Sequence, residues 1–158
     1  MKIYFAGPLF TEAERRWIRG VKREIEELAA RRGRSVEVLW PYELLDREEA
    51  EALGEGAKRE IFLRCKTHLE DSDLLLALLD GPQVDDGVAW EMGYFFRLRE
   101  GASRPIIGIR TDFRRAGEAK NSIVNAMIEC SCDRIAASTE ELLAILPDFL
   151  EAGELGRR

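Results

Sequence analysis

The stretch LLLALLDGPQVDDGVAWEMG, residues 74–93, decides the fold of this 158-residue chain. Its unbroken apolar run over 74–79 is typical of a strand that is buried on both faces, as in the centre of a parallel sheet. The residues Asp80-Gly81-Pro82 end this strand, and apolar side chains then recur at helical spacing over 87–100. A buried strand followed directly by a helix predicts a β–α unit of an α/β fold.

The same alternation of strand and helix continues towards both ends of the chain. Upstream, the sequence predicts strands over 2–6 and 36–40, a helix capped by Thr11 and ended by Gly33, an acidic loop with some helix over 42–56, and a helix over 57–69. Downstream, it predicts strands over 105–109 and 134–137, helices over 121–130 and 139–150, and a loosely held tail over 151–158.

Five β–α steps in so short a chain predict one domain, residues 1–158, with a doubly wound five-stranded parallel sheet and helices on both faces. With the strand order 2-1-3-4-5, the topological switch lies between the first and third strands, and ligands bind at the carboxyl ends of strands near such a switch. The loops expected there are residues 6–10, which contain Gly7 and Phe10, and residues 80–87. We therefore expect the binding site between these two loops.

Composition limits the classes of partner. Asp and Glu outnumber Lys and Arg by 30 to 24, and the resulting net charge of −6 argues against DNA or RNA as a partner. The longest apolar run is far too short to span a membrane, and the N-terminus lacks the pattern of a signal peptide. The three cysteines and the single His68 match no common zinc spacing. We expect free thiols in a reducing cytoplasm and no metal site.

Glu91 is the candidate for chemistry, in the first turns of the helix predicted over 87–100. A carboxylate near a helix N-terminus is stabilised in its ionised, nucleophilic form. Asp85 lies just before this helix and Asp73 at the start of the third strand, and glycoside chemistry uses such carboxylate pairs. Gly87 allows close approach of a ligand to the backbone. From the residues alone, the alternative that Asp85 is a helix cap and Glu91 a solvated dipole partner remains open.

Four motifs together resemble nucleoside 2-deoxyribosyltransferases, over about Lys2 to Glu129. They are KIYFAGPLFTEAE (2–14), DSDLLLALLDG (71–81), DDGVAWEMGY (85–94) and VNAMIE (124–129). The resemblance implies a flavodoxin-like fold and transfer of 2-deoxyribose between purine and pyrimidine bases, without metal or cofactor. The substrates would be small-molecule 2'-deoxynucleosides and free bases.

The resemblance also implies roles for individual residues. The family's nucleophilic glutamate falls on Glu91, and the two aspartates that hold the base and assist its protonation fall on Asp73 and Asp85. The aromatic residue that positions the nucleophile falls on Tyr4. The asparagine that reaches a neighbouring subunit's site falls on Asn125, with Asn121 the less favoured match, which implies a homo-oligomer.

The C-terminal residues keep alternatives open. The chain ends in ELGRR, residues 154–158, where some members of the family have an aromatic residue that enters the active site. Hydrolysis of a 2'-deoxynucleoside or of its 5'-monophosphate, the latter as in the related deoxynucleoside 5'-monophosphate N-hydrolases, is therefore one alternative, and a non-catalytic nucleotide-binding module is another. We expect the base to be bound by side chains from residues 42–56.

Overall fold

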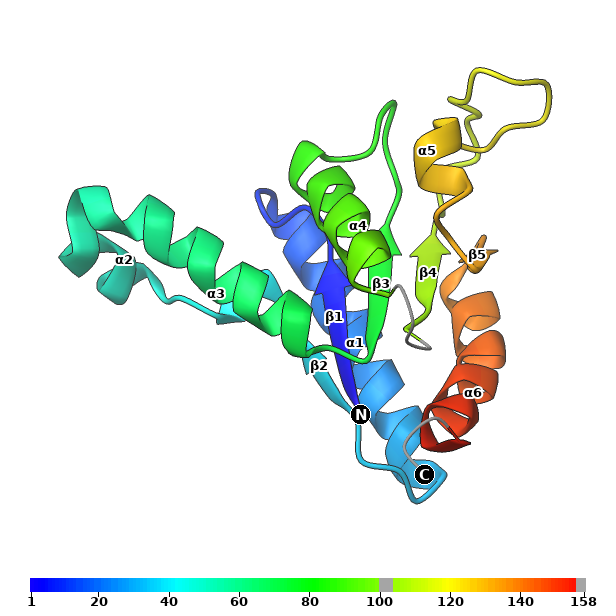
Figure 1. Cartoon of the computed structure of the whole chain (residues 1–158), viewed down its shortest axis with the longest axis horizontal. Helices are drawn as coiled ribbons and strands as arrows, with labels where there is room; N and C mark the ends of the chain where they lie inside the picture. Colours follow the sequence, from blue (N-terminus) through cyan, green and yellow to red (C-terminus); the bar gives the residue numbers. More distant parts are fainter. Residues whose placement is uncertain (100–103, 156–158) are drawn as a thin grey trace.

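The computed structural model describes residues 1–99 and 104–155, which form a parallel sheet flanked by helices (Figure 1). The sheet order is β2-β1-β3-β4-β5 and every pairing is parallel, which confirms the predicted fold and strand order. The strands are β1 (Lys2–Ala6), β2 (Glu37–Leu39), β3 (Leu74–Leu78), β4 (Ile106–Ile109) and β5 (Arg134–Ala136). The helices are α1 (Glu12–Arg31), α2 (Arg47–Leu53), α3 (Ala57–Asp71), α4 (Asp86–Leu98), α5 (Ala126–Glu129) and α6 (Thr139–Leu155), with two short 3₁₀ turns, η1 (Pro41–Glu43) and η2 (Gly54–Gly56).

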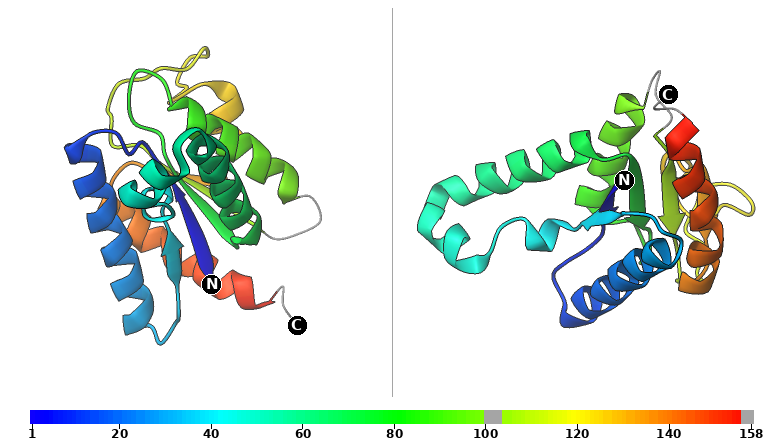
Figure 2. Two further views of the ribbon diagram at one scale, coloured as in Figure 1. Left: turned by 90° about the vertical axis from the view of Figure 1, so that its left-hand side faces the viewer. Right: turned by 90° about the horizontal axis from the view of Figure 1, so that it is seen from below.

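The sheet divides the core into two layers because successive side chains of a strand point to opposite faces. On β1, Ile3 and Phe5 pack with α1 and α6, whereas Tyr4 and Ala6 pack with α3 and α4 (Figure 2). All five residues of β3 are buried, as expected for a central strand covered on both sides. The two layers therefore place Tyr4 on the same side of the sheet as α4.

Helix α1 begins and ends where its sequence predicts. Thr11 accepts a hydrogen bond from the Glu14 backbone N–H, and the Glu14 side chain accepts one from the Thr11 N–H, which together form a capping box. Gly33, with φ of +67°, follows the last turn. The buried side chains of the helix, Ile18 to Ala29, lie on the face that packs on the sheet. This packing holds the β1–α1 loop at the carboxyl edge of the sheet.

An arm projects sideways from the sheet and is formed by α2, η2 and the outer part of α3 (Figures 1 and 2). Residues 42–56 were predicted as a loop with some helix, and they form the end of η1, a connecting stretch, α2 and η2. Asp46 caps α2 by accepting a hydrogen bond from the Glu49 N–H at 2.7 Å. The base of α3 packs on the sheet through Leu69, so the arm is anchored at one end.

One expectation on the C-terminal half was wrong. Of the helix predicted over 121–130, only Ala126–Glu129 is α-helical, because Asn121 has φ of +77° and the Glu129 carboxylate holds the N–H groups of Ile123 and Val124 outside the helix. Helix α6 runs through Glu151 as far as Leu155, and Glu151 forms an ion pair of 3.8 Å with Arg32, which follows α1. Residues 156–158 lie outside the described part, as does Glu100 of the helix predicted over 87–100.

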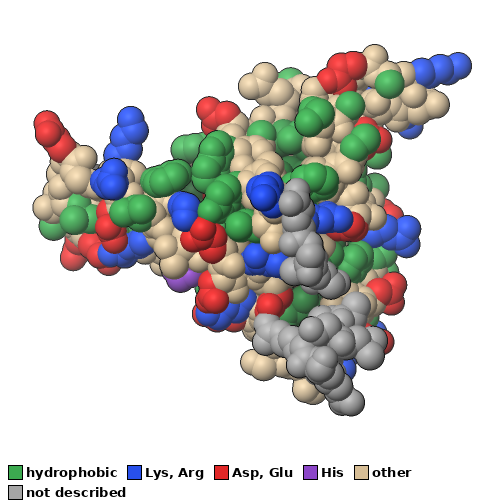
Figure 3. Space-filling view, in the orientation of Figure 1, with side chains coloured by type: hydrophobic (Ala, Val, Ile, Leu, Met, Phe, Trp, Pro, Cys, Tyr) green, Lys and Arg blue, Asp and Glu red, His purple; other side chains and the backbone are tan. Residues whose placement is uncertain are grey.

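Apolar side chains remain exposed where α3 and α4 face solvent, as the space-filling view shows (Figure 3). Phe62 of α3 and Trp90 of α4 are each about half exposed and meet edge to face, with ring centroids 5.6 Å apart. Within the part of the chain that the structure describes, none of the helices combines the length and the apolarity needed to cross a membrane.

Gly108 on β4 provides a test of the core packing. A Cβ at this position would lie 2.6 Å from Leu79 Cδ1 and 3.2 Å from both Cys132 Sγ and Ile135 Cγ1, so Gly108→Ala should lower the free energy of unfolding by about 1–3 kcal/mol. Gly20→Ala on α1 is the matched control: nothing lies within 4 Å of its Cβ position, and it should raise stability by up to about 1 kcal/mol. Urea unfolding of both variants measures the contrast. Equal stability of the two would contradict the packing described for β4.

Candidate active site

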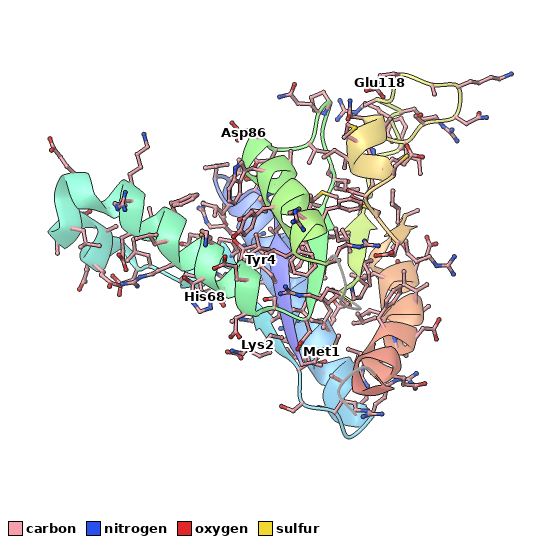
Figure 4. All side chains as sticks on the ribbon, viewed as in Figure 1. Met1, Lys2, Tyr4, His68, Asp86 and Glu118 are labelled. Atoms are coloured by element: carbon pink, nitrogen blue, oxygen red, sulfur yellow. The ribbon has the colours of Figure 1, made fainter. Side chains whose placement is uncertain are left out.

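A hydrogen bond between β1 and α4 lies at the centre of the candidate site. The Tyr4 hydroxyl donates to Glu91 Oε1 at 2.5 Å. Tyr4 is fully buried in the middle of β1, and Figure 4 shows it between α3 and α4. Burial and the neighbouring Glu91 carboxylate raise the pKa of Tyr4 well above its usual range, so the phenol keeps its proton and acts as a donor.

Glu91 is held in a different electrostatic environment from the one its helix position suggested. It lies in the second turn of α4, beyond the free N–H groups of the first turn. Burial raises the pKa of Glu91 to about 7, the Tyr4 hydrogen bond opposes this rise, and the Asp85 charge adds to it. The carboxyl group therefore titrates in the neutral range, where a small change in its surroundings changes the fraction that is ionised.

Asp85 begins α4 and faces the same cavity. Its Oδ1 accepts hydrogen bonds from the Gly87 and Val88 N–H groups at 3.0 and 3.1 Å, so it is the N-cap of the helix. The alternative that Asp85 caps a helix is therefore correct, but the cap uses only one of its two carboxylate oxygens. Asp85 lines the cavity together with Glu91 and Gly87. Two carboxylates consequently share one partly enclosed space.

The cavity has a volume of about 670 Å³ and opens at the carboxyl ends of β1 and β3, where the predicted switch point lies. Mostly apolar side chains form its walls. They come from the β1–α1 loop, from η1 and the segment after it, from α3 and from the start of α4: Gly7, Leu9, Phe10, Tyr42, Leu44, Leu45, Ala50, Ile61, Cys65 and Val88. An apolar space of this size with a few polar groups fits a small organic ligand.

Arg64 of α3 holds the outer wall in place. Its guanidinium donates to the Leu44 carbonyl at 2.9 Å and forms ion pairs with Glu49 of α2 and Glu60 of α3. These contacts tie the segment between η1 and α2 to α3. On the opposite side of the cavity, Arg15 donates to the Leu9 and Phe10 carbonyls, which fixes the β1–α1 loop.

A second network fixes the loop between β3 and α4. The buried Arg110, which follows β4, donates to the carbonyls of Leu79 and Gly81. Asp80 accepts hydrogen bonds from the backbone N–H groups of Thr111 and Asp112 at 2.6 and 2.9 Å. The loop that carries Asp85 is therefore bound to the neighbouring strand rather than held by its own residues.

The structure brings most, but not all, of the predicted site residues together. Gly7, Phe10, Asp85, Gly87 and Glu91 line the cavity, and Tyr4 is bonded to Glu91 beneath it. Asp73 does not line this cavity.

Asp73 lies before β3, at the amino edge of the sheet, where its Oδ2 accepts a hydrogen bond from the Lys2 N–H at 2.8 Å. The cavity opens at the opposite edge of the sheet, where Gly7 and Leu9 follow β1 and Asp85 and Gly87 follow β3. Asp73 was expected beside the base, but the parallel register of β1 and β3 places it at the sheet edge opposite the cavity.

Asn125 does not line the cavity of its own chain. It caps α5 through its Oδ1, which accepts from the Met127 N–H at 3.0 Å, and its amide donates to Glu118. Figure 4 shows Glu118 at the outer end of the molecule, in the loop before α5. Met127, the second residue of α5, is 80% exposed.

Sequence reasoning missed Arg64 and Cys65 as site residues. Cys65 lies on the same side of the helix as Ile61 and Leu69, a signal that could have pointed to the cavity only if the packing partner of α3 had been known. Within the described residues, no group of three or more His, Cys, Asp or Glu side chains is arranged to hold a metal ion.

Comparison with known protein families assigns the chain to a class. A sequence model of the nucleoside 2-deoxyribosyltransferase family matches residues 3–127, which is most of the chain, so the chain belongs to that family and the predicted resemblance is confirmed.

Two solved structures are similar to the chain. One is a conserved protein from Enterococcus faecalis V583, with 29% identity and a TM-score of 0.73, covering 94% of this chain and 98% of that one. The other is the 2-deoxyribosyltransferase of the psychrotolerant bacterium Bacillus psychrosaccharolyticus, with 22% identity and a TM-score of 0.63, covering 90% of each chain. The second shares the fold. A comparison with curated proteins gives no significant match.

The environment of Glu91 predicts a pH-dependent stability. Its pKa is about 7 in the folded chain against a usual 4.5, so the folded state binds the proton more tightly and stability falls as pH rises through this window. Glu91→Gln stays neutral and should therefore gain stability relative to the parent chain between pH 5 and pH 8, by about 1–3 kcal/mol at the upper end.

Chemical denaturation at several pH values measures this difference. The same exchange at the exposed Glu55, outside the cavity, controls for the general effect of removing one carboxylate. A Glu91→Gln difference that stayed constant with pH would show that burial does not control this group.

Proposed function

We propose that the chain transfers 2-deoxyribose between nucleobases by double displacement, with Glu91 as the nucleophile. The observation that carries this proposal is the Glu91 carboxyl group, bonded to Tyr4 at the base of an apolar cavity of about 670 Å³. Tyr4 fixes the orientation of the carboxylate, and the cavity walls exclude much of the water that would otherwise surround it. Family membership supports deoxyribosyl transfer as the reaction class.

In the first step, an oxygen of Glu91 attacks C1' of a 2'-deoxynucleoside. The C1'–O bond forms as the C1'–N bond breaks, and the electron pair leaves with the base, which takes up a proton. Asp85, which faces the same cavity, assists this protonation. In the second step, another base attacks C1' and loses a proton, and the Glu91 carboxylate is released. Protons and electrons balance over the two steps.

The apolar wall from residues 41–50 and α3 is where we place the base. Tyr42 and Phe10 provide aromatic surface, and Leu44 and Ile61 add aliphatic surface. Planar heterocycles bind well to such walls. The deoxyribose would then lie between the base and Glu91, close to the backbone of Gly7 and Gly87.

The charge of the cavity favours a donor without a 5'-phosphate. Among the described lining residues, the acidic side chains Glu43, Asp46, Asp85 and Glu91 face a single cation, Arg64. Arg64 is already paired with Glu49 and Glu60. A phosphate placed here would meet more negative than positive charge, so the substrate class we propose is the uncharged 2'-deoxynucleoside.

Product analysis by chromatography tests the proposal directly. With a 2'-deoxynucleoside and a different acceptor base, the chain should form the new deoxynucleoside, and Glu91→Gln should lose at least about a thousandfold in rate because the nucleophile is gone. Trapping with a 2'-fluoro donor should add one sugar mass at Glu91, read by mass spectrometry of the intact protein and its peptides.

Other outcomes of the same experiment are decisive. Free base formed at the same rate with or without acceptor would make the chain a hydrolase. Faster turnover of a 5'-monophosphate donor would overturn the charge argument. Unchanged ligand binding without any turnover, in both the parent chain and Glu91→Gln, would make it a binding module. Asp85→Asn keeps the helix cap, so a loss of rate in this variant reports the carboxylate itself.

Asn125 is proposed to act in the site of a neighbouring subunit, since it lies outside the cavity of its own chain. Glu91→Gln and Asn125→Ala should each be nearly inactive alone. Co-expressed as a mixed dimer in equal amounts, they should recover about a quarter of the parent activity, because a statistical mixture restores one intact site in half of the dimers. Enzyme assay of the purified mixture measures this. A mixture as inactive as its parents would place Asn125 outside any shared site.

A further inference from the structure

Arg15 of α1 joins the two segments that carry the aromatic residues of the cavity. Its Nη1 donates to the Leu9 carbonyl at 2.9 Å and to the Phe10 carbonyl at 2.8 Å. The same guanidinium lies over the ring of Tyr42 in η1, with Cζ 5.5 Å from the ring centroid, which is within the range of a cation–π contact. One side chain therefore holds the β1–α1 loop and η1 against each other.

The backbone of Phe10 is held from both sides. The Phe10 N–H donates to Glu14 Oε2 at 3.1 Å, and the Phe10 carbonyl accepts from Arg15. The phenyl ring lines the cavity although the residue is 72% exposed. The position of this ring therefore depends mainly on the two backbone contacts and not on packing in the core.

Tyr42 is fixed through its ring. The ring packs against the buried Trp40, with centroids 4.9 Å apart, and Arg15 contacts it from α1. Tyr42 is 43% exposed and lines the cavity, so part of its surface remains open to a ligand. Phe10 and Tyr42 thus share one anchor, the guanidinium of Arg15.

Arg15 belongs to a row of cations on α1 that holds η1 in place. Arg15, Arg19 and Lys22 are spaced four and three residues apart, so they lie on one face of the helix. Arg19 lies over the Trp40 ring at 5.9 Å, and Lys22 forms an ion pair of 2.5 Å with Glu43. Arg15, at the end of the row, adds the contacts to the β1–α1 loop.

We propose that Arg15 is a positioning residue for the nucleobase: it fixes Phe10 and Tyr42 as the aromatic surface against which the base binds. The inference deepens the proposed function and rests on its placement of the base at this wall. Arg15 is not among the described residues that line the cavity, so it acts through the two rings. Without it, binding of the base would carry the cost of ordering both side chains.

The test measures the Kd of 2'-deoxynucleosides by NMR titration. The full-length Glu91→Gln chain is the host, because it should not turn the ligand over, and the probes are 2'-deoxyadenosine, 2'-deoxyguanosine, 2'-deoxycytidine and thymidine. Arg15→Met should raise the Kd of the tightest-binding probe at least about tenfold, since two aromatic side chains lose their anchor. Arg16→Met, the same exchange at an exposed arginine paired with Glu12, is the control and should change this Kd by less than about twofold.

A background with Phe10→Leu and Tyr42→Leu decides whether Arg15 acts through the two rings. Leucine keeps apolar surface in the wall, so weak binding remains measurable. In this background, Arg15→Met should change Kd by less than about twofold, because the rings that Arg15 fixes are gone. A tenfold loss that persists would overturn the proposal, and so would an Arg15→Met variant that binds as well as the Arg16→Met control.

In the active chain, the effect should fall on the donor KM. Arg15→Met should raise KM by about the same factor as Kd and lower kcat by less than about threefold, as expected when binding common to the ground state and the transition state is lost. A lowered kcat with an unchanged KM would mean that Arg15 affects the reacting groups, contrary to the proposal. If Arg15→Met does not fold, Arg15→Lys replaces it, with Arg16→Lys as the control. Lysine lacks the planar guanidinium, so Kd should still rise about threefold or more.

The binding titration needs no turnover, so it separates this inference from the proposed function. A Kd that responds to Arg15→Met, in a chain that transfers no sugar, would contradict the proposed reaction and leave the role of Arg15 intact. Normal transfer in the parent chain, with a Kd that does not respond to Arg15→Met, would contradict the role of Arg15 alone.

Discussion

The hydrogen bond from Tyr4 to Glu91 is the interaction on which the site depends, because it joins the interior strand β1 to helix α4. Its strand end is determined by register: the alternation along β1 turns Tyr4 towards α3 and α4, while Ile3 and Phe5 face α1 and α6. Its helix end is determined by the Asp85 cap and by the packing of Val88, Met92 and Phe95.

A rotation of α4 by one residue, about 100°, would carry Glu91 away from Tyr4. The cap and the apolar contacts of α4 are therefore what orients the carboxylate. A one-residue slip in β1 would turn Tyr4 to the other layer of the core in the same way. The reaction we propose thus depends on contacts that are also the main packing contacts of the domain.

The arm formed by α2, η2 and the outer part of α3 creates the environment of this bond. Without the wall from Leu44, Leu45 and Ile61, the end of α4 would face water and Glu91 would be an ordinary surface carboxylate. The wall removes water from the carboxyl group and raises its pKa to about 7. Burial therefore destabilises the ionised form of Glu91, and the hydrogen bond from Tyr4 offsets part of this effect. Arg64 is the main polar tie between the wall and α3.

The strands and their parallel order were predictable from the sequence, and the candidate cavity lies at the switch point that this order implies. The signals that predicted the elements are local ones, because each depends on residues close together in the sequence. They are the apolar run over 74–79, the Thr11–Glu14 capping box, and the turn residues Gly33 and Asp80-Gly81-Pro82. Family motifs pointed to Glu91, Asp85 and Tyr4: the first two line one cavity, and Tyr4 is bonded to Glu91 beneath it. The late start of α5 was not predicted, because it depends on a side-chain contact: the Glu129 carboxylate accepts hydrogen bonds from the Ile123 and Val124 N–H groups and keeps these residues out of the helix.

Which carboxylates lie at the same cavity, and how strongly each holds its proton, depends on the tertiary structure. Asp73 and Asp85 are both aspartates beside β3, yet the parallel register places one at the amino edge of the sheet and the other at the cavity. Glu91 was expected to be ionised from its helix position, whereas burial under a wall from residues 41–50 outweighs the helix dipole. Desolvation and contacts between distant segments depend on the packed geometry, and neither is encoded in the spacing of residues along the chain.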